Sequence, residues 1–175
     1  MDNPVAEVEE VIRSVTEPYP ASVLAANVEK YFTEDAVLRH PFLVAKGREA
    51  IKGIYKIVRV QTVNQKIDFH AVMFNEDKTQ ITIDLTEHMN TRLCSYRCSR
   101  VSIRLLVRLH LVQGTDRKYR IRKQEDNFSS DTGVVGILLP FMPGFSLLGS
   151  LVRVLIGFGI GKIGRFLLSR GWLGQ

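Results

Sequence analysis

The stretch VEKYFTEDAVLRHPFLVAKGREAIKGIY, Val28 to Tyr55, holds the signals that decide the fold. Tyr31 and Phe32 close an apolar helical stripe, and the acidic turn "TED" follows them. Residues 36–39 predict a short strand that runs into His40 and a proline. Gly47 then precedes a second amphipathic pattern, so a helix is expected after it. The segment therefore predicts the end of a helix, then a strand, and then the start of another helix.

On the N-terminal side, apolar residues recur at helical spacing from Val5 to Val15, with Asn3 and Pro4 as start signals. The helix after Gly47 should turn Ile51 and Tyr55 inward. Its outer face should carry solvated charges at Glu49, Lys52, Lys56 and Arg59. Three helices are therefore expected before the main sheet.

On the C-terminal side, four segments alternate between apolar and polar residues, which predicts a four-stranded antiparallel meander over 66–74, 80–89, 101–112 and 119–128. In the first of these strands, Ile67, Phe69, Ala71 and Met73 should share the apolar face. His70, His88 and His110 alternate away from the apolar faces of their strands, so they are expected at the surface.

The charge distribution divides the chain near Asp131, the last acidic residue. The net charge of +6 comes mostly from the segment after it, and residues 1–131 are nearly neutral, which argues against nucleic-acid binding. The N-terminal "MDNPVAEVEE" has no features of a secretory or mitochondrial signal, so a cytosolic location is expected. There Cys94 and Cys98 stay reduced. Their spacing, without a second pair, does not predict a metal site.

Val28 to Tyr55 resembles the signature of the nuclear-transport-factor-2-like superfamily (SnoaL-like), which includes ketosteroid isomerase and scytalone dehydratase. The order of helices followed by a meander extends the resemblance over residues 5–128. It implies an α+β fold in which a cone-shaped, curved antiparallel sheet wraps around three N-terminal helices and leaves an apolar pocket. Residues 1–131 would form this cone domain. The segment 132–175 departs from the usual pattern of the superfamily.

Two residues are candidates for acid–base catalysis. His40 directly precedes a proline. The resemblance implies that His40 occupies the position of the carboxylate base of ketosteroid isomerase. The unperturbed pKa of a histidine suits proton transfer near neutrality. Glu87 shares the apolar face of its strand, so it should point into the cone with a raised pKa. His40 could instead serve a turn, and Glu87 could pair with Arg104 or Arg108 or turn outward at a bulge.

The walls of the cone supply the expected ligand contacts. Tyr31 and Tyr55 could offer hydroxyls to a ligand oxygen, and the last strand carries a polar group where the superfamily often has one. The candidate ligand-binding residues are Tyr31, Tyr55, Phe69, Ile83, Leu105 and Asp126. No motif for a cofactor or metal is present, so an enzyme of this sequence would need none.

The segment GVVGILLPFMPGFSLLGSLV, Gly133 to Val152, carries no charge. Pro140 and Pro143 break it into two short halves, which favours a helical hairpin lying in one leaflet of a membrane over a straight span. A bitopic helix over 145–161, or an apolar flap over the cone or a dimer partner, are the alternatives. The residues expected to contact the membrane are Phe141, Phe145, Leu151, Arg153, Phe158, Lys162, Arg165 and Trp172.

Together these features favour a monotopic module that binds a hydrophobic small molecule, such as a sterol, terpenoid or acyl lipid. It would be docked on the cytosolic face of the endoplasmic reticulum or on a lipid droplet. One alternative is a cofactor-free isomerase, cyclase or dehydratase acting on a lipophilic substrate. Another is a scaffold that forms a homodimer through the outer face of the sheet.

Overall fold

A computed structural model describes residues 1–18, 20–41, 43–91 and 99–128, together with 151, 154, 155, 158, 159, 162 and 166. The chain divides into two compact units, Met1–Phe128 and Ser129–Gln175. The helices of the first unit are α1 (Pro4–Thr16), α2 (Ala21–Tyr31) and α3 (Arg48–Gln61). Its strands are β1 (Phe32–His40), β2 (Leu43–Lys46), β3 (Thr62–Phe74), β4 (Gln80–Thr91), β5 (Ser99–Gln113) and β6 (Tyr119–Phe128).

Helix α1 begins where the sequence predicts, because Asn3 caps it. The Asn3 Oδ1 atom accepts a hydrogen bond from the Val5 N–H at 3.2 Å, and the Glu7 carboxylate accepts one from the Asn3 N–H at 2.6 Å. Its apolar stripe of Val8, Val11, Ile12 and Val15 is buried. The helix is thus fixed both by its cap and by the face that it buries.

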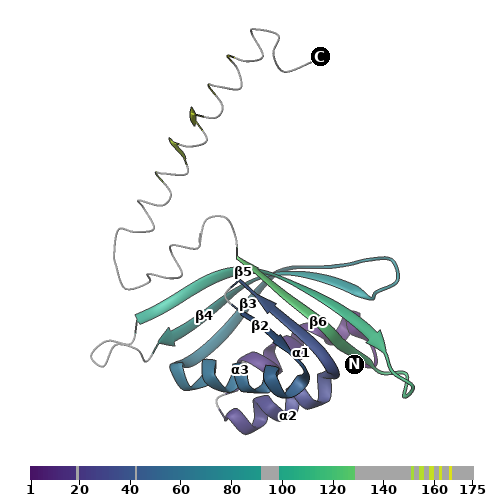
Figure 1. Ribbon diagram of the computed structural model, residues 1–175. Coiled ribbons are helices and arrows are strands. Elements are labelled where there is room, and N and C mark those ends of the chain that lie inside the picture. The colour runs from purple at the N-terminus through teal and green to yellow at the C-terminus, as the bar shows by residue number, and fades with distance from the viewer. Residues whose placement is uncertain are drawn as a thin grey trace. The chain divides into compact units, whose positions relative to one another are not determined.

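The strands form one 6-stranded sheet in the order β2-β1-β6-β5-β4-β3. The β1–β6 pair is parallel and the other pairs are antiparallel. The sheet is curved and unclosed, and the three helices pack together against its concave side (Figure 1). The buried core lies between them and includes Phe32, Ile51, Ile83 and Leu109. The predicted α+β cone is confirmed.

The β1–β2 hairpin differs from what the sequence predicts. Strand β1 covers Phe32–His40 rather than 36–39 alone, and β2 returns beside it after a tight turn, with Arg39 opposite Val44. Strand β2 has only four residues, Leu43–Lys46. A strand this short shows too few alternations to be recognised from sequence. The β1–β2 hairpin brings the chain to Gly47, where α3 starts.

The expectation that Arg59 is a solvated charge of α3 is wrong. Arg59 is 4% exposed, and its guanidinium donates hydrogen bonds to the carbonyl oxygens of Thr16 and Glu17. These carbonyls lie at the C-terminal end of α1, where backbone oxygens have no partner within the helix. A cation there satisfies the oxygens and interacts favourably with the helix dipole, which gives the buried Arg59 side chain its polar partners.

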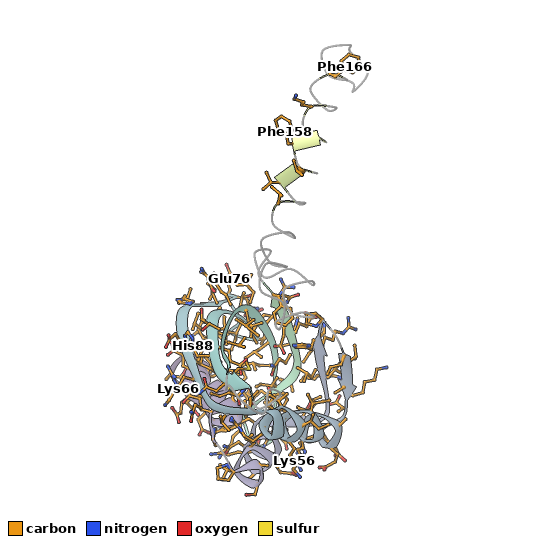
Figure 2. All side chains as sticks on the ribbon, turned by 90° about the vertical axis from the view of Figure 1, so that its left-hand side faces the viewer. Lys56, Lys66, Glu76, His88, Phe158 and Phe166 are labelled. Atoms are coloured by element: carbon orange, nitrogen blue, oxygen red, sulfur yellow. The ribbon has the colours of Figure 1, made fainter. Side chains whose placement is uncertain are left out.

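In the second unit, three of the eight predicted membrane contacts are described: Leu151, Phe158 and Lys162. All three are exposed, and the Lys162 ammonium lies over the Phe158 ring, 4.7 Å from its centroid. Phe158 and Phe166 project from this segment (Figure 2). Phe141, Phe145, Arg153, Arg165 and Trp172 lie outside the described residues, as do Cys94 and Cys98. Among the described positions, no helix has the length and apolar character needed to cross a membrane.

Candidate functional site

The interior of the cone is formed by the inward faces of four neighbouring strands. Facing residues such as Leu85 and Leu105, or Ile83 and Val107, meet across the β4–β5 pair. Most of these side chains are apolar and buried. Against this background, a small set of polar side chains points into the interior, Tyr55 from α3 and the others from the sheet: His40, Gln65, Glu87, Gln124 and Asp126.

A bulge in β3 changes which residues face the interior. The register of the β3–β4 pair shifts between Phe69 and Ala71, so Val72 pairs with Ile83 and faces inward. The expectation that Ala71 and Met73 share the face of Ile67 and Phe69 is therefore wrong. Met73 is 52% exposed. Phe69 keeps its predicted inward position, with the Arg13 guanidinium 4.9 Å from its ring centroid.

Glu87 lies on the inner face of β4, opposite Ile67 on one side and Ile103 on the other. Its Oε1 atom accepts a hydrogen bond from the Gln65 side-chain amide at 2.6 Å. The pKa of Glu87 is raised to about 7, mainly by burial; the hydrogen bond from Gln65 opposes this rise, the charge of Asp126 supports it, and the charge of Arg59 opposes it. The Glu87 side chain is half-buried, so it keeps some accessible surface. Glu87 can thus hold or release a proton near neutrality.

Asp126 is the second carboxylate of the interior, on β6 opposite Val107. Its Oδ1 atom accepts a hydrogen bond from the Gln124 amide at 2.9 Å, and the Tyr55 hydroxyl donates to Gln124 Oε1 at 3.3 Å. Burial raises the pKa of Asp126 to about 6. Burial, reinforced by the charge of Asp126, also raises the pKa of Tyr55, so its hydroxyl stays protonated. Tyr55 is therefore a proton donor to hydrogen bonds in this site.

His40 ends β1 on the same face as Leu38. The parallel register sets Leu38 opposite Gln124, so the next inward residue of β1 lies beside the end of β6. The His40 ring meets the Phe128 ring edge-on, with their centroids 5.2 Å apart. Burial lowers the pKa of His40, which favours the neutral imidazole. A neutral imidazole can accept a proton, as a general base must.

The structure brings some predicted ligand contacts to this cluster and not others. Tyr55, Phe69 and Asp126 join it. Ile83 is fully buried and Leu105 is 8% exposed, so both contribute to the packed wall. Tyr31 is not brought in: its hydroxyl lies beside the exposed ammonium of Lys30, where this hydrogen bond raises the pKa of Lys30.

Sequence analysis missed Gln65 and Gln124, which are the hydrogen-bond partners of the two carboxylates. Both are buried, 4% and 6% exposed. A buried glutamine needs polar partners, but a strand pattern does not show which polar residue faces inward beside a bulge. The one available signal is spacing: Gln65 is two residues before Ile67, and Gln124 two before Asp126.

The outer face of the sheet carries a second polar arrangement. His88 contacts Ser102 Oγ through Nδ1 at 2.7 Å and Asp68 Oδ2 through Nε2 at 2.9 Å. His88 lies on the outside of the cone, as its alternation predicts (Figure 2). Backbone N–H groups lie in the plane of a sheet, whereas the Ser102 side chain stands out of it, so the strands offer no oxyanion hole here. We therefore assign no hydrolytic role to this trio.

The described residues contain no group of three His, Cys, Asp or Glu side chains that could hold a metal ion. Five of the six inward polar side chains are linked by hydrogen bonds, Gln65 with Glu87 and Tyr55 through Gln124 with Asp126, while the His40 ring contacts Phe128. Apolar residues surround them. Their chemistry is that of proton transfer and hydrogen bonding in an apolar enclosure.

The family model for the SigF NTF2-like domain matches residues 1–172. The chain belongs to this family. The match confirms the resemblance of Val28–Tyr55 to the nuclear-transport-factor-2-like superfamily, and it extends through the segment after residue 131. Among curated proteins, none matches the chain.

Solved structures share the fold of this SigF NTF2-like domain at low sequence identity. An epoxide hydrolase/cyclase-like enzyme of pyran ring formation in the polyether salinomycin has a TM-score of 0.57 and 18% identity, covering 74% of this chain and 95% of that one. A candidate scytalone dehydratase from Novosphingobium aromaticivorans has a TM-score of 0.55 and 15% identity, covering 71% and 83%. A hypothetical protein with a ketosteroid isomerase-like fold from Catenulispora acidiphila, solved in complex with trimethylamine, has a TM-score of 0.54 and 15% identity, covering 73% of this chain and 90% of that one.

Proposed function

We propose that this protein is a cofactor-free acid–base catalyst that isomerises, cyclises or dehydrates a small lipophilic molecule inside the cone. The observation that carries this proposal is the presence of two interior carboxyls, Glu87 held by Gln65 and Asp126 held by Gln124, whose pKa values are raised mainly by burial to about 7 and about 6. Carboxyls shifted toward neutrality in an enclosed apolar site are typical of general acids and bases. His40, neutral and beside Phe128, is the third group that can move a proton.

The roles divide by protonation state. Near pH 7, His40 and ionised Asp126 can accept a proton from the substrate, while Glu87 is close to half-protonated and can donate one. Tyr55 remains protonated, so it can donate a hydrogen bond to Gln124 or to a developing oxyanion. The names of the fold relatives, an epoxide hydrolase/cyclase-like enzyme and a candidate dehydratase, agree with this class of chemistry.

Proton exchange tests this proposal without knowledge of the natural substrate. Small lipophilic ketones are incubated with the protein in D2O, and loss of the hydrogen on the carbon next to the carbonyl is followed by NMR. His40→Ala, Glu87→Gln and Asp126→Asn should each lower the exchange rate, by about 10²–10⁴-fold for the residue that acts as the base. His88→Ala, on the outer face, is the control and should leave the rate unchanged.

The competing function is a binding module that holds a lipophilic molecule without changing it. It is favoured by the apolar inner wall, in which Phe69, Val72, Ile103 and Phe128 keep partly accessible surface. If ketones bind but no variant changes their exchange rate, the protein is a binder. Mass spectrometry of a molecule that copurifies with the protein would then identify the ligand.

We also propose that the segment after Asp131 docks the cone on the cytosolic face of the endoplasmic reticulum or on a lipid droplet. This segment has no acidic residue and four basic ones, a composition suited to anionic headgroups. Its described apolar side chains, Leu151, Val154, Leu155, Phe158 and Phe166, are all more than half exposed. In a helix, the spacing of these residues places them on one face together with Lys162, so the apolar side chains would enter the acyl layer while the long lysine side chain reaches the headgroups.

A further inference from the structure

A cavity of about 630 Å³ opens on the outside of the cone, at the corner where α1 ends and β3 begins. Its wall includes Arg13, Glu17, Arg59, Gln65 and Lys66. Gln65 connects this corner cavity with the interior by a hydrogen bond, because it lines the cavity and its amide also donates to Glu87 at 2.6 Å. It therefore forms part of the wall between solvent and the candidate acid.

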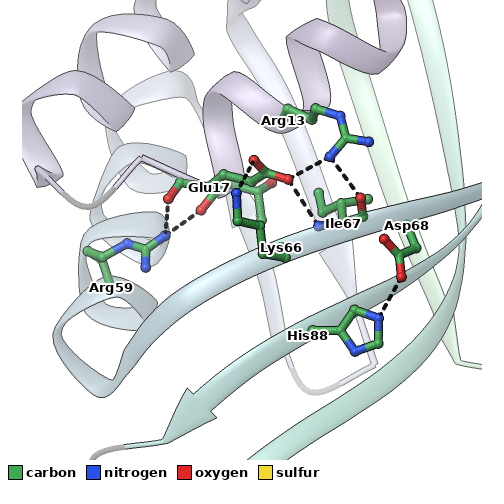
Figure 3. A network of polar contacts seen from close by, with 8 residues as sticks. Arg13, Glu17, Arg59, Lys66, Ile67, Asp68 and His88 are labelled. Carbon is green, nitrogen blue, oxygen red and sulfur yellow. Dashed lines mark hydrogen bonds and ion pairs between the residues drawn. The ribbon is translucent and has the colours of Figure 1, made fainter.

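The corner is held by a dense polar network (Figure 3). The Glu17 carboxylate accepts hydrogen bonds from Arg13 at 2.7 Å and from the Ile67 N–H at 3.0 Å. Arg13 also donates to the Ile67 carbonyl oxygen at 2.8 Å. With Arg59 bound to the last carbonyls of α1, the network joins α1, α3 and β3. Three elements thus fix the backbone beside Gln65.

A bulge places Gln65 in this wall. The β3–β4 register shifts between Val63 and Lys66, and Asn64 takes the left-handed conformation with φ at 54°. The next residue, Gln65, is only 4% exposed, whereas Asn64 and Lys66 on either side are exposed. Bulges commonly redirect a side chain toward a functional site.

Glutamine suits a carboxyl that changes its protonation state. Its amide can donate to an ionised carboxylate and, after turning over, accept from a protonated carboxyl. A lysine or arginine in the same place would hold Glu87 ionised. The charged or titratable groups that act on Glu87 are Arg59 and Tyr55 on α3 and Asp126 on β6, and Gln65 is its neutral partner.

We propose that Gln65 is the positioning residue of Glu87, and that it orients the carboxyl and sets its proton affinity from the corner cavity rather than from the mouth of the cone. This inference deepens the proposed function, since it rests on Glu87 as an acid–base group. It also has a steric consequence. Shortening Gln65 would join the corner cavity to Glu87 and leave room for a small amide to take its place.

The test is a carboxyl titration of the full chain by ¹³C NMR, with Glu87→Gln used to identify the Glu87 signal. Gln65→Met keeps the size of the side chain but loses the hydrogen bond, so the Glu87 pKa should rise by about one unit. Gln65→Ala should raise it similarly, and acetamide should lower it again in Gln65→Ala but not in Gln65→Met. Gln113→Ala, in the β5–β6 hairpin, is the matched control and should leave the Glu87 signal unchanged.

An unmoved Glu87 pKa in Gln65→Met would overturn the inference, and so would acetamide acting equally on both variants. If one variant fails to fold, as judged by its NMR spectrum, the other still gives the titration. The titration needs no substrate, so it tests Gln65 independently of catalysis. A shifted Glu87 pKa in Gln65→Met, in a protein that turns over no substrate, would overturn the catalytic proposal but keep Gln65 as the partner of Glu87. If instead the protein turns over a substrate and the pH profile is the same in Gln65→Met, the catalytic proposal stands and the role of Gln65 is overturned.

Discussion

Glu87 couples the stability of the protein to pH. Its pKa is about 7 in the folded chain, against an ordinary value of 4.5. The folded state therefore keeps a proton that the unfolded state releases, so this contribution is complete below pH 4.5 and is lost as pH rises through 7. The loss is at most about 3 kcal/mol, and less because Glu87 is only partly buried. Urea unfolding between pH 4.5 and 8 should show Glu87→Gln gaining stability relative to the native chain as pH rises. A constant difference between the two proteins across this range would contradict the raised pKa.

At the scale of single residues, the alternation of apolar and polar residues predicted which side chains face inward on regular strands, but not beside bulges. Glu87 follows Ile81, Ile83 and Leu85 without interruption, so its inward position could be read from the sequence. Met73 lies beyond the bulge of β3, and one extra residue moved it to the outer face. The proximity of the interior carboxyls depends on strand curvature and pairing, which no local pattern contains.

At the scale of elements, two glycines give a matched prediction. Gly47 precedes α3 with φ at 87°, a conformation that side chains strongly disfavour. Gly47→Ala should lower the free energy of unfolding by about 1–3 kcal/mol. Gly53 lies within α3, and a Cβ atom there would meet no atom within 4 Å, so Gly53→Ala should stabilise the helix by about 0.5–1 kcal/mol. Chemical denaturation of both variants checks the pair, and equal effects would show that the backbone at Gly47 carries no strain.

Helices and long strands were the elements that sequence predicted best. Strand β6 lies over the predicted residues 119–128, and Asn3 caps α1 as expected. The strand and the buried side chain that the sequence did not predict depend on contacts with residues far away in the chain. Strand β2 exists because it pairs with β1, and Arg59 is buried because the end of α1 presents two carbonyl oxygens to it. Local propensity cannot reveal such contacts.

At the scale of the whole molecule, the basic segment after Asp131 should decide where the protein is found. Removing residues 132–175 should leave a folded cone that no longer floats with vesicles containing anionic lipid, because the apolar and basic contacts are lost together. Changing Lys162, Arg165 and Arg170 to glutamate should weaken vesicle binding by about 1 kcal/mol or more per residue, or roughly 100-fold in all. The same change at Lys46, Lys56 and Lys78, exposed on the cone, is the charge-matched control and should have little effect.

Flotation measured at two salt concentrations separates the possible outcomes. Binding that ignores both salt and the tail substitutions would mean that apolar insertion alone anchors the chain. A full-length protein that stays soluble without detergent and unfolds when truncated would mean that the segment covers the cone instead.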